Sequence, residues 1–143
     1  AAVVDRVISH SVEETEAFGA ALAPALHSGA VLALFGGMGM GKTALVRGIA
    51  RGMGLTAPVS SPTFALVHDY GGTPPLVHFD MYRVSGWDDL YSTGFFDYLA
   101  AGAILVVEWS ENIENALPAD AIRLYFSAPD EQTRCIERVV PSE

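Results

Sequence analysis

The sequence contains little positive charge. Lysine and arginine together number eight against 17 acidic residues, so the formal net charge is −9 and the pI is near 4.7. A domain that binds nucleic acid by itself needs a basic surface that neutralises phosphates. The composition therefore argues against autonomous nucleic-acid binding. An acidic surface is typical of a soluble protein, and it also fits steering toward a basic partner; the sequence leaves both open.

Cysteine and long apolar runs are also scarce. Cys135 is the only cysteine, which excludes an internal disulfide and fits a reducing, cytoplasmic location. We expect Cys135 to serve as a small hydrophobic residue in a C-terminal strand. The longest apolar runs have the length of strands, well short of the roughly 18 residues of a membrane span, and no secretory leader is recognisable. We therefore expect no membrane association.

One glycine-rich segment, residues 36–43, matches a phosphate-binding loop. It fits the pattern G-x-x-x-x-G-K-[ST] at every fixed position, and a random match in a chain of this composition has odds of roughly one in a thousand. An apolar strand pattern at residues 31–35 enters the segment, and a helical pattern at residues 44–50 leaves it. Backbone N–H groups and a helix dipole then converge on an anion. The residues expected to bind nucleotide phosphates are Gly36, Gly37, Met38, Gly39, Met40, Gly41, Lys42, Thr43 and Ala44.

Lys42 is the only lysine of the chain. We expect it to be an exposed loop residue whose flexible charge reaches the phosphates, and so to contribute little to stability. P-loop GTPases read guanine with a separate Asn-Lys-x-Asp element, which a chain without a second lysine cannot contain. ATP is therefore the expected nucleotide.

Binding of Mg²⁺ and orientation of an attacking water both require oxygen atoms of side chains near the phosphates. The Thr43 hydroxyl is placed to ligate Mg²⁺, and two apolar runs end in an acid, at Asp80 and at Glu108. Glu108 follows the more hydrophobic run, so we favour it as the metal ligand, with Asp80 orienting water or holding the metal through water. Lys42, Asp80 and Glu108 are the expected catalytic residues. We expect His78 to be a hydrogen-bonded structural residue, and the four histidines show no zinc-ligand spacing.

Hydrophobic patterning predicts an α/β protein. Half of the residues are hydrophobic and no linker divides the chain, so we expect residues 1–143 to form a single domain. Ser11 and Glu14 fit the capping box of a first helix, which we expect to end near residues 28–29. The helix after the glycine-rich segment is expected to end around residues 52–54, with a buried stripe at Leu45, Ile49 and Met53.

Strand patterns fill most of the remaining chain. Residues 103–107 form a continuous apolar run, which predicts a central strand covered on both faces. The other expected elements are strands at 64–70 and 76–80 joined by a turn, short helices at 87–90 and 95–99, and a terminal hairpin of 121–126 with 133–140. We predict an α/β fold of the P-loop NTPase type, with three layers, a mixed, mainly parallel central sheet and a C-terminal β-hairpin.

Four segments together resemble the TsaE family, the bacterial ATPases of tRNA threonylcarbamoyladenosine biosynthesis. They occur in the family's order and cover almost the whole chain. They are residues 34–43, then Ser61-Pro62-Thr63-Phe64, then His78-Phe79-Asp80-Met81-Tyr82-Arg83, and finally Val107-Glu108-Trp109. The glycine-rich segment alone is widespread, whereas the other motifs are far more specific.

The resemblance implies an Mg²⁺-dependent ATPase. Thr63 is then a sensor of the γ-phosphate or metal, and Arg83 and Trp109 lie around the nucleotide or a partner surface. The implied partner is the TsaB–TsaD pair, which modifies adenosine 37 of tRNA, so tRNA is met only indirectly through partners. Two alternatives remain at this point: a small-molecule P-loop kinase, and a non-enzymatic module in which ATP orders a switch loop.

Overall fold

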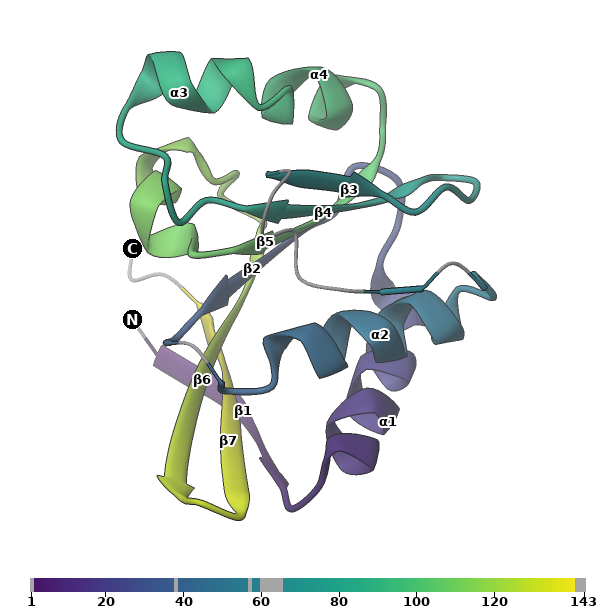
Figure 1. The fold of residues 1–143 in the computed structure, drawn as a ribbon, viewed down its shortest axis with the longest axis vertical. Coiled ribbons are helices and arrows are strands. Elements are labelled where there is room, and N and C mark those ends of the chain that lie inside the picture. The colour runs from purple at the N-terminus through teal and green to yellow at the C-terminus, as the bar shows by residue number, and fades with distance from the viewer. Residues whose placement is uncertain (1, 38, 57, 60–65, 141–143) are drawn as a thin grey trace.

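A seven-stranded mixed sheet forms the centre of the molecule (Figure 1). The computed structural model describes residues 2–37, 39–56, 58–59 and 66–140. The strand order is β1-β7-β6-β2-β5-β4-β3. The strands are β1 (Ala2–Ser9), β2 (Val31–Phe35), β3 (Val67–Asp69), β4 (Leu76–Asp80), β5 (Ile104–Glu108), β6 (Ile122–Asp130) and β7 (Thr133–Val140).

Helices cover both faces of this sheet (Figure 1). Helices α1 (Val12–Leu22) and α2 (Lys42–Gly52) pack on one face. The other face carries α3 (Trp87–Ser92), α4 (Phe95–Ala100) and the 3₁₀ segment η2 (Ser110–Ala116). Two buried apolar clusters result, because alternate residues of the central strands point to opposite faces. Within the described ranges, no helix is long and apolar enough to cross a membrane.

The predicted α/β class and the C-terminal hairpin of β6 and β7 are confirmed, but the expectation of a mainly parallel sheet is wrong. Of the six strand pairings, β2–β6, β2–β5 and β4–β5 are parallel, and β1–β7, β6–β7 and β3–β4 are antiparallel. The hairpins β3–β4 and β6–β7 give two antiparallel pairings, and the edge strand β1 adds the third by pairing with β7. The sheet is therefore only partly parallel.

Strand β1 was not anticipated from the sequence. It pairs with β7, more than 120 residues away in the chain, with a register shift between Val3 and Asp5. Val3, Val4 and Ile8 are all about half exposed, so the strand lacks the clean alternation of apolar and polar residues that marks a half-buried strand. Its position depends on a distant partner, which local sequence patterns do not reveal.

The first helix ends earlier than expected. Its start is confirmed, because the Glu14 N–H donates to Ser11 Oγ at 3.0 Å. Helix α1 ends at Leu22, and the 3₁₀ turn η1 (Ala23–Ala25) follows it instead of continuing to residue 28. Pro24 explains this difference, since proline has no N–H to donate within a helix.

The remaining predicted elements lie close to their expected places. Strand β5 is buried along its whole length between β2 and β4, and α2 ends at Gly52 with Leu45 and Ile49 fully buried. The turn at residues 71–75 joins antiparallel β3 and β4, and α3 and α4 match the two short helix candidates. Residues 64 and 65 of the expected strand lie outside the described part of the chain. Cys135 is buried in β7, as predicted.

Glycines allow α1 and α2 to pack backbone against backbone. A Cβ atom added to Gly48 would lie 1.9 Å from the carbonyl oxygen of Glu16, and one added to Gly19 would lie 2.3 Å from that of Leu45. Gly52 is also close, because its Cβ atom would meet the Ala20 oxygen at 2.8 Å. No side chain fits between the two helices at these positions, so α1 fixes the position of α2.

We expect Gly48→Ala to destabilise the protein by about 2 kcal/mol or more, because overpacking against backbone forces the helices apart. Alanine normally stabilises a helix interior by about 1 kcal/mol relative to glycine, so the expected sign is the reverse of the helix propensity. Urea unfolding of Gly48→Ala and Gly52→Ala tests this, with the smaller loss in Gly52→Ala. An unchanged or raised unfolding free energy in Gly48→Ala would contradict this helix contact.

Candidate active site

The phosphate loop, residues 36–43, connects β2 to α2 (Figure 1). Gly36, Gly39 and Gly41 have φ values of 127°, 76° and 95°, a region that favours glycine. A Cβ atom on Gly36 would also lie 2.7 Å from the carbonyl oxygen of Phe126. Both features show why these positions hold glycine. Met38 lies outside the described residues, and Gly37 is exposed.

Lys42 is buried, contrary to the expectation of an exposed loop residue. It is 5% exposed and forms the first residue of α2. Its Nζ donates to the carbonyl oxygen of Gly36 at 2.6 Å and lies 5.0 Å from the centroid of the Trp109 ring. The loop curls around the ammonium group, so that a backbone carbonyl and an aromatic face replace water around the charge.

Thr43 and Ala44 follow Lys42 in the first turn of α2. Their backbone N–H groups belong to the positive end of the helix dipole. Thr43 is partly exposed and Ala44 is buried. The start of α2 therefore offers N–H donors and one hydroxyl at the phosphate loop.

The two candidate acids lie side by side at the end of the sheet. Asp80 ends β4 and Glu108 ends β5, and the parallel register pairs them directly. Strand β5 also runs parallel to β2, which leads into the phosphate loop. The carboxyl ends of three adjacent parallel strands thus meet at one edge, where ligands of open α/β sheets usually bind. This arrangement brings Lys42, Asp80 and Glu108 together.

Asp80 has an unusual electrostatic environment. Partial burial raises the pKa of its carboxyl above the ordinary value, and the neighbouring Glu108 raises it further. The Tyr82 N–H, which donates to Asp80 Oδ1 at 2.9 Å, acts in the opposite direction, as do the charges of His78 and Lys42. Desolvation is the largest of these effects, so the pKa of Asp80 is raised.

Glu108 is held by His78 inside the sheet. His78 is fully buried in β4, and its Nε2 lies 2.6 Å from Glu108 Oε2. The prediction that His78 is a hydrogen-bonded residue is confirmed, but the sequence did not reveal its partner. That partner is one of the two candidate acids, so His78 belongs to the site.

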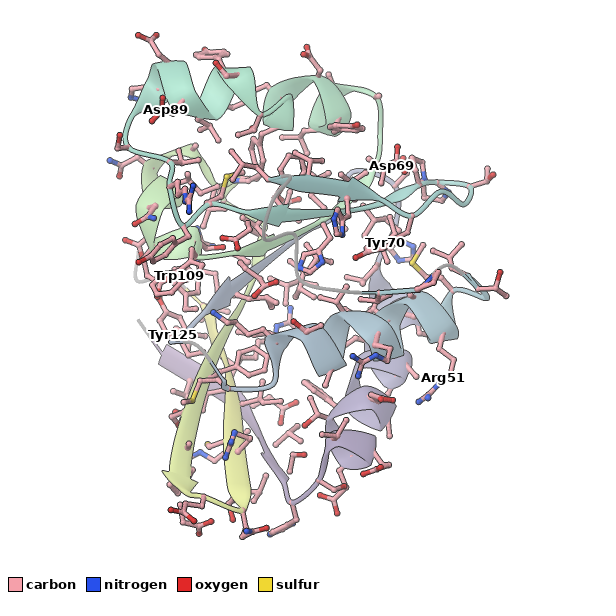
Figure 2. All side chains as sticks on the ribbon, in the orientation of Figure 1. Arg51, Asp69, Tyr70, Asp89, Trp109 and Tyr125 are labelled. Carbon is pink, nitrogen blue, oxygen red and sulfur yellow. The ribbon has the colours of Figure 1, made fainter. Side chains whose placement is uncertain are left out.

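Trp109 lies next to Glu108 and closes one side of the Lys42 environment. Its φ of 57° is the only positive value among the described non-glycine residues, and its ring lies 4.9 Å from that of Tyr82. Figure 2 places Trp109 on the side of η2. Arg83 is exposed and forms no ion pair with any other described residue. Thr63, the expected phosphate sensor, lies outside the described residues.

Two polar residues of η2 support the site and were missed from the sequence. Glu111 Oε2 accepts from the Gly36 N–H at 3.3 Å, and Asn112 Nδ2 donates to the Met81 carbonyl at 2.8 Å. Both side chains fix backbone that carries site residues. In the sequence they are ordinary polar residues after a strand, so no signal marks them.

A cavity of about 240 Å³ adjoins the phosphate loop. It lies between the loop, the start of α1 and the tip of the β6–β7 hairpin. It is lined by Ser9, His10, Ser11, Val12, Thr15, Gly39, Gly41, Ala44, Glu131, Gln132 and Arg134. Thr15 and Ser9 share a hydrogen bond of 2.7 Å between their hydroxyls beneath Gly41. The phosphate loop therefore has a second concave region on the side away from the acids.

The chain is similar to several proteins that share one family name. A family model described as threonylcarbamoyl adenosine biosynthesis protein TsaE matches residues 9–136. The Bacillus subtilis protein named tRNA threonylcarbamoyladenosine biosynthesis protein TsaE is 35% identical over 123 residues, covering 85% of this chain and 77% of its own. The protein of the same name from Streptomyces coelicolor is 41% identical over 109 residues, which is 74% of each chain.

A solved structure has the same fold. The crystal structure of YdiB from Bacillus subtilis superimposes with a TM-score of 0.78 and 30% sequence identity. The match covers 96% of this chain and 86% of the other.

The raised pKa of Asp80 predicts that this carboxylate costs stability. Between the ordinary pKa of 3.8 and the raised value, the folded state binds more protons than the unfolded state, so stability falls as pH rises. Asp80→Asn keeps an oxygen for the Tyr82 N–H but removes the charge. We expect it to raise Tm at pH 7, and the gain to shrink as pH falls toward 3.8.

Thermal unfolding at several pH values measures this effect. Asp120→Asn, at an exposed position before β6, is the control and should show no such pH-dependent gain. A lower Tm for Asp80→Asn at pH 7 would mean that the charged carboxylate stabilises the fold.

Proposed function

The chain belongs to the TsaE family of tRNA threonylcarbamoyladenosine biosynthesis proteins, and from this premise we propose that it hydrolyses ATP to ADP and phosphate in that process. One observation carries the proposal: Lys42, Asp80 and Glu108 meet where β2, β4 and β5 end beside a phosphate loop. This is the set of groups that hydrolysis of a phosphoanhydride needs, namely an anion cradle, a cation and carboxylates.

Phosphate binding is the role of the loop and of Lys42. Backbone N–H groups of residues 36–44 and the dipole of α2 hold the phosphate oxygens. Lys42 exchanges its bond to the Gly36 carbonyl for a phosphate oxygen, while the Trp109 face keeps the ammonium group near the loop. The positive charge then stabilises the negative charge that develops on the transferred group.

The site residues fit Mg²⁺. Hydroxyl and carboxylate oxygens are its preferred ligands, and Mg²⁺ takes few of them from the protein because it keeps phosphate and water ligands. Thr43 and Glu108 would hold the ion, which neutralises phosphate charge when bound.

Asp80 is suited to orient the attacking water. Its carboxyl is less buried than that of Glu108, and its raised pKa makes it a better proton acceptor than an ordinary aspartate. The water oxygen attacks the γ-phosphorus, the bond to the β–γ bridging oxygen breaks, and the water proton passes toward Asp80 or a phosphate oxygen. ADP and inorganic phosphate are the products.

The cavity beside the loop suits the nucleoside. It lies next to β6 and β7, on the opposite side of β2 from the acids. Backbone groups, hydroxyls and the side chains of Gln132 and Arg134 can hydrogen-bond a base and a ribose. With its only lysine committed to phosphate, the chain favours adenine over guanine. ATP thus spans from this cavity to the acids.

The partner in the proposal is the TsaB–TsaD pair, which would carry the tRNA. Large aromatic side chains are exposed in the segment that follows Asp80 and in α3: Tyr82 is 59% exposed, Trp87 54% and Tyr91 63%. Exposed aromatic residues of this size are typical anchors of protein interfaces. The acidic residues Asp88 and Asp89 lie among them, so encounter with a basic partner surface is favoured electrostatically.

Lys42→Ala is expected to reduce ATP hydrolysis by about 10²–10³-fold, the cost of losing one cationic donor at the transition state. The control is Arg51→Ala, which removes an exposed cation from the other end of α2 and should keep near-normal activity. Phosphate release from ATP measures both. Wild-type activity in Lys42→Ala would refute the assignment of the phosphate site, whereas ATP binding without hydrolysis in the wild type would favour a nucleotide-gated module.

Substitutions of the two acids are expected to affect different steps. Glu108→Gln should weaken Mg²⁺-dependent nucleotide binding, since a metal ligand acts on the bound ground state. Asp80→Asn should mainly lower kcat, since orientation of water acts on the transition state. Titration of Mg²⁺ against nucleotide affinity, together with kcat, separates the two effects. The opposite pattern would exchange their assigned roles.

The partner claim predicts that hydrolysis alone is slow and is stimulated by TsaB–TsaD. Arg83→Ala and Thr63→Ala should lose stimulation more than ATP binding, and association should weaken as salt rises. The deciding measurement is threonylcarbamoyl-adenosine formation over several turnovers with this protein present or omitted. Equal yields would refute the pathway role and leave the ATP site untouched.

A further inference from the structure

A row of polar side chains crosses the sheet behind the two acids. Tyr70, just after β3, has its hydroxyl 3.2 Å from His68 Nδ1 and 3.4 Å from His78 Nδ1. His78 in turn bonds Glu108 through Nε2 at 2.6 Å. The row therefore runs from the edge strand β3 through β4 to the end of β5. Figure 2 shows Tyr70 toward the β3–β4 hairpin and Trp109, next to Glu108, toward η2.

The hydrogen bonds constrain the placement of the His78 ring. An ionised carboxylate only accepts hydrogen bonds, so the Nε2 side of the ring donates to Glu108. On the other side of the ring, Nδ1 faces the Tyr70 hydroxyl, which also contacts His68 Nδ1. His78 therefore has a polar partner at each ring nitrogen.

Burial makes the His78–Glu108 contact obligatory. The His78 side chain has no exposed surface and lies in an apolar strand between Val77 and Phe79, while 7% of the Glu108 side chain is exposed. A buried polar group without a partner costs about 1–3 kcal/mol. Neither residue can satisfy its buried group if the other turns away. Oε2 of Glu108 is thereby fixed by the His78 ring.

We propose that His78 is a positioning residue that holds the Glu108 carboxylate in its working orientation, and that Tyr70 holds the His78 ring in turn. The proposal rests on the proposed function, because Glu108 must act on bound nucleotide for its orientation to matter. A glutamate has three side-chain torsions, and an unanchored carboxylate would spread over several rotamers. Outer residues of this kind commonly affect activity or metal affinity 10–100-fold, although they do not touch the substrate.

Mg²⁺-dependent nucleotide binding tests the role of His78, because Glu108 is the proposed metal ligand. His78→Leu is expected to raise the Mg²⁺ concentration for half-maximal nucleotide binding about 10–100-fold, while nucleotide affinity without Mg²⁺ stays within about twofold, because the phosphate loop keeps its contacts. His78→Gln restores an N–H donor and should recover part of the loss. A folded His78→Leu protein with a wild-type Mg²⁺ requirement would overturn the proposal. If His78→Leu does not fold, a His78→Gln protein of native Tm whose Mg²⁺ requirement is unchanged while its nucleotide affinity without Mg²⁺ falls overturns it instead.

A double-mutant cycle tests whether Tyr70 acts through His78. Tyr70→Phe alone should raise the Mg²⁺ requirement for nucleotide binding by a few-fold, because its 3.4 Å contact is longer and weaker. In the His78→Leu background it should cause no further change, since the ring that it holds is gone. Additive effects on the Mg²⁺ requirement would overturn the role of Tyr70. Tyr98→Phe, which changes a tyrosine packed on the other face against Phe79, is the matched control and should leave the Mg²⁺ requirement unchanged.

Nitrogen NMR of the histidine side chains gives a readout that does not depend on catalysis. Tyr70→Phe should shift the His78 Nδ1 signal, which loses its hydrogen bond, and Tyr98→Phe should not. An unmoved Nδ1 signal would overturn the Tyr70 contact. A wild-type protein that hydrolyses no ATP, alone or with partner, would refute the proposed function while the Nδ1 shift still established the row of side chains.

Discussion

The parallel alignment of β2, β4 and β5 is the constraint on which the site depends. Parallel strands end at the same edge of a sheet, so three segments that are far apart in sequence deliver their next residues to one place. Strand β2 delivers the phosphate loop, β4 delivers Asp80 and β5 delivers Glu108. The two apolar layers hold this alignment in place, because the strands are buried on both faces. The chemistry is thus located by the core rather than by the loops.

The charged groups at this edge differ in what replaces water around them. The Lys42 ammonium is surrounded by a backbone carbonyl and an aromatic face, and the Glu108 carboxylate contacts the His78 imidazole. Among the described residues Asp80 has no such side-chain partner, and it shows a raised pKa instead. The Asp80 N–H bonds the Leu66 carbonyl next to β3, the same edge strand that supports His78 through Tyr70. Both acids are therefore supported from the edge strand.

Local signals predicted much of this arrangement. The strand, glycine loop and helix at residues 31–52 follow from patterns within a few residues, as do the acids that end β4 and β5. The burial of Lys42 did not follow, because it depends on Trp109, 67 residues further along the chain. Strand β1 was missed for the same reason, since its partner β7 is distant and both sides of the strand are partly exposed. Contacts between remote residues have no periodic signature, so His78 was recognised as bonded but not as the partner of Glu108.

The glycine contact between α1 and α2 has a mechanical consequence. Backbones that touch at Gly19 and Gly48 leave no compressible side-chain layer between the helices, so the two move as one rigid body. The phosphate loop leads into α2, and the start of α1 forms a wall of the neighbouring cavity. The spacing between loop and wall is therefore constant. The width of the cavity beside the loop is thus set by contact between two backbones and does not depend on the rotamers of side chains between the helices.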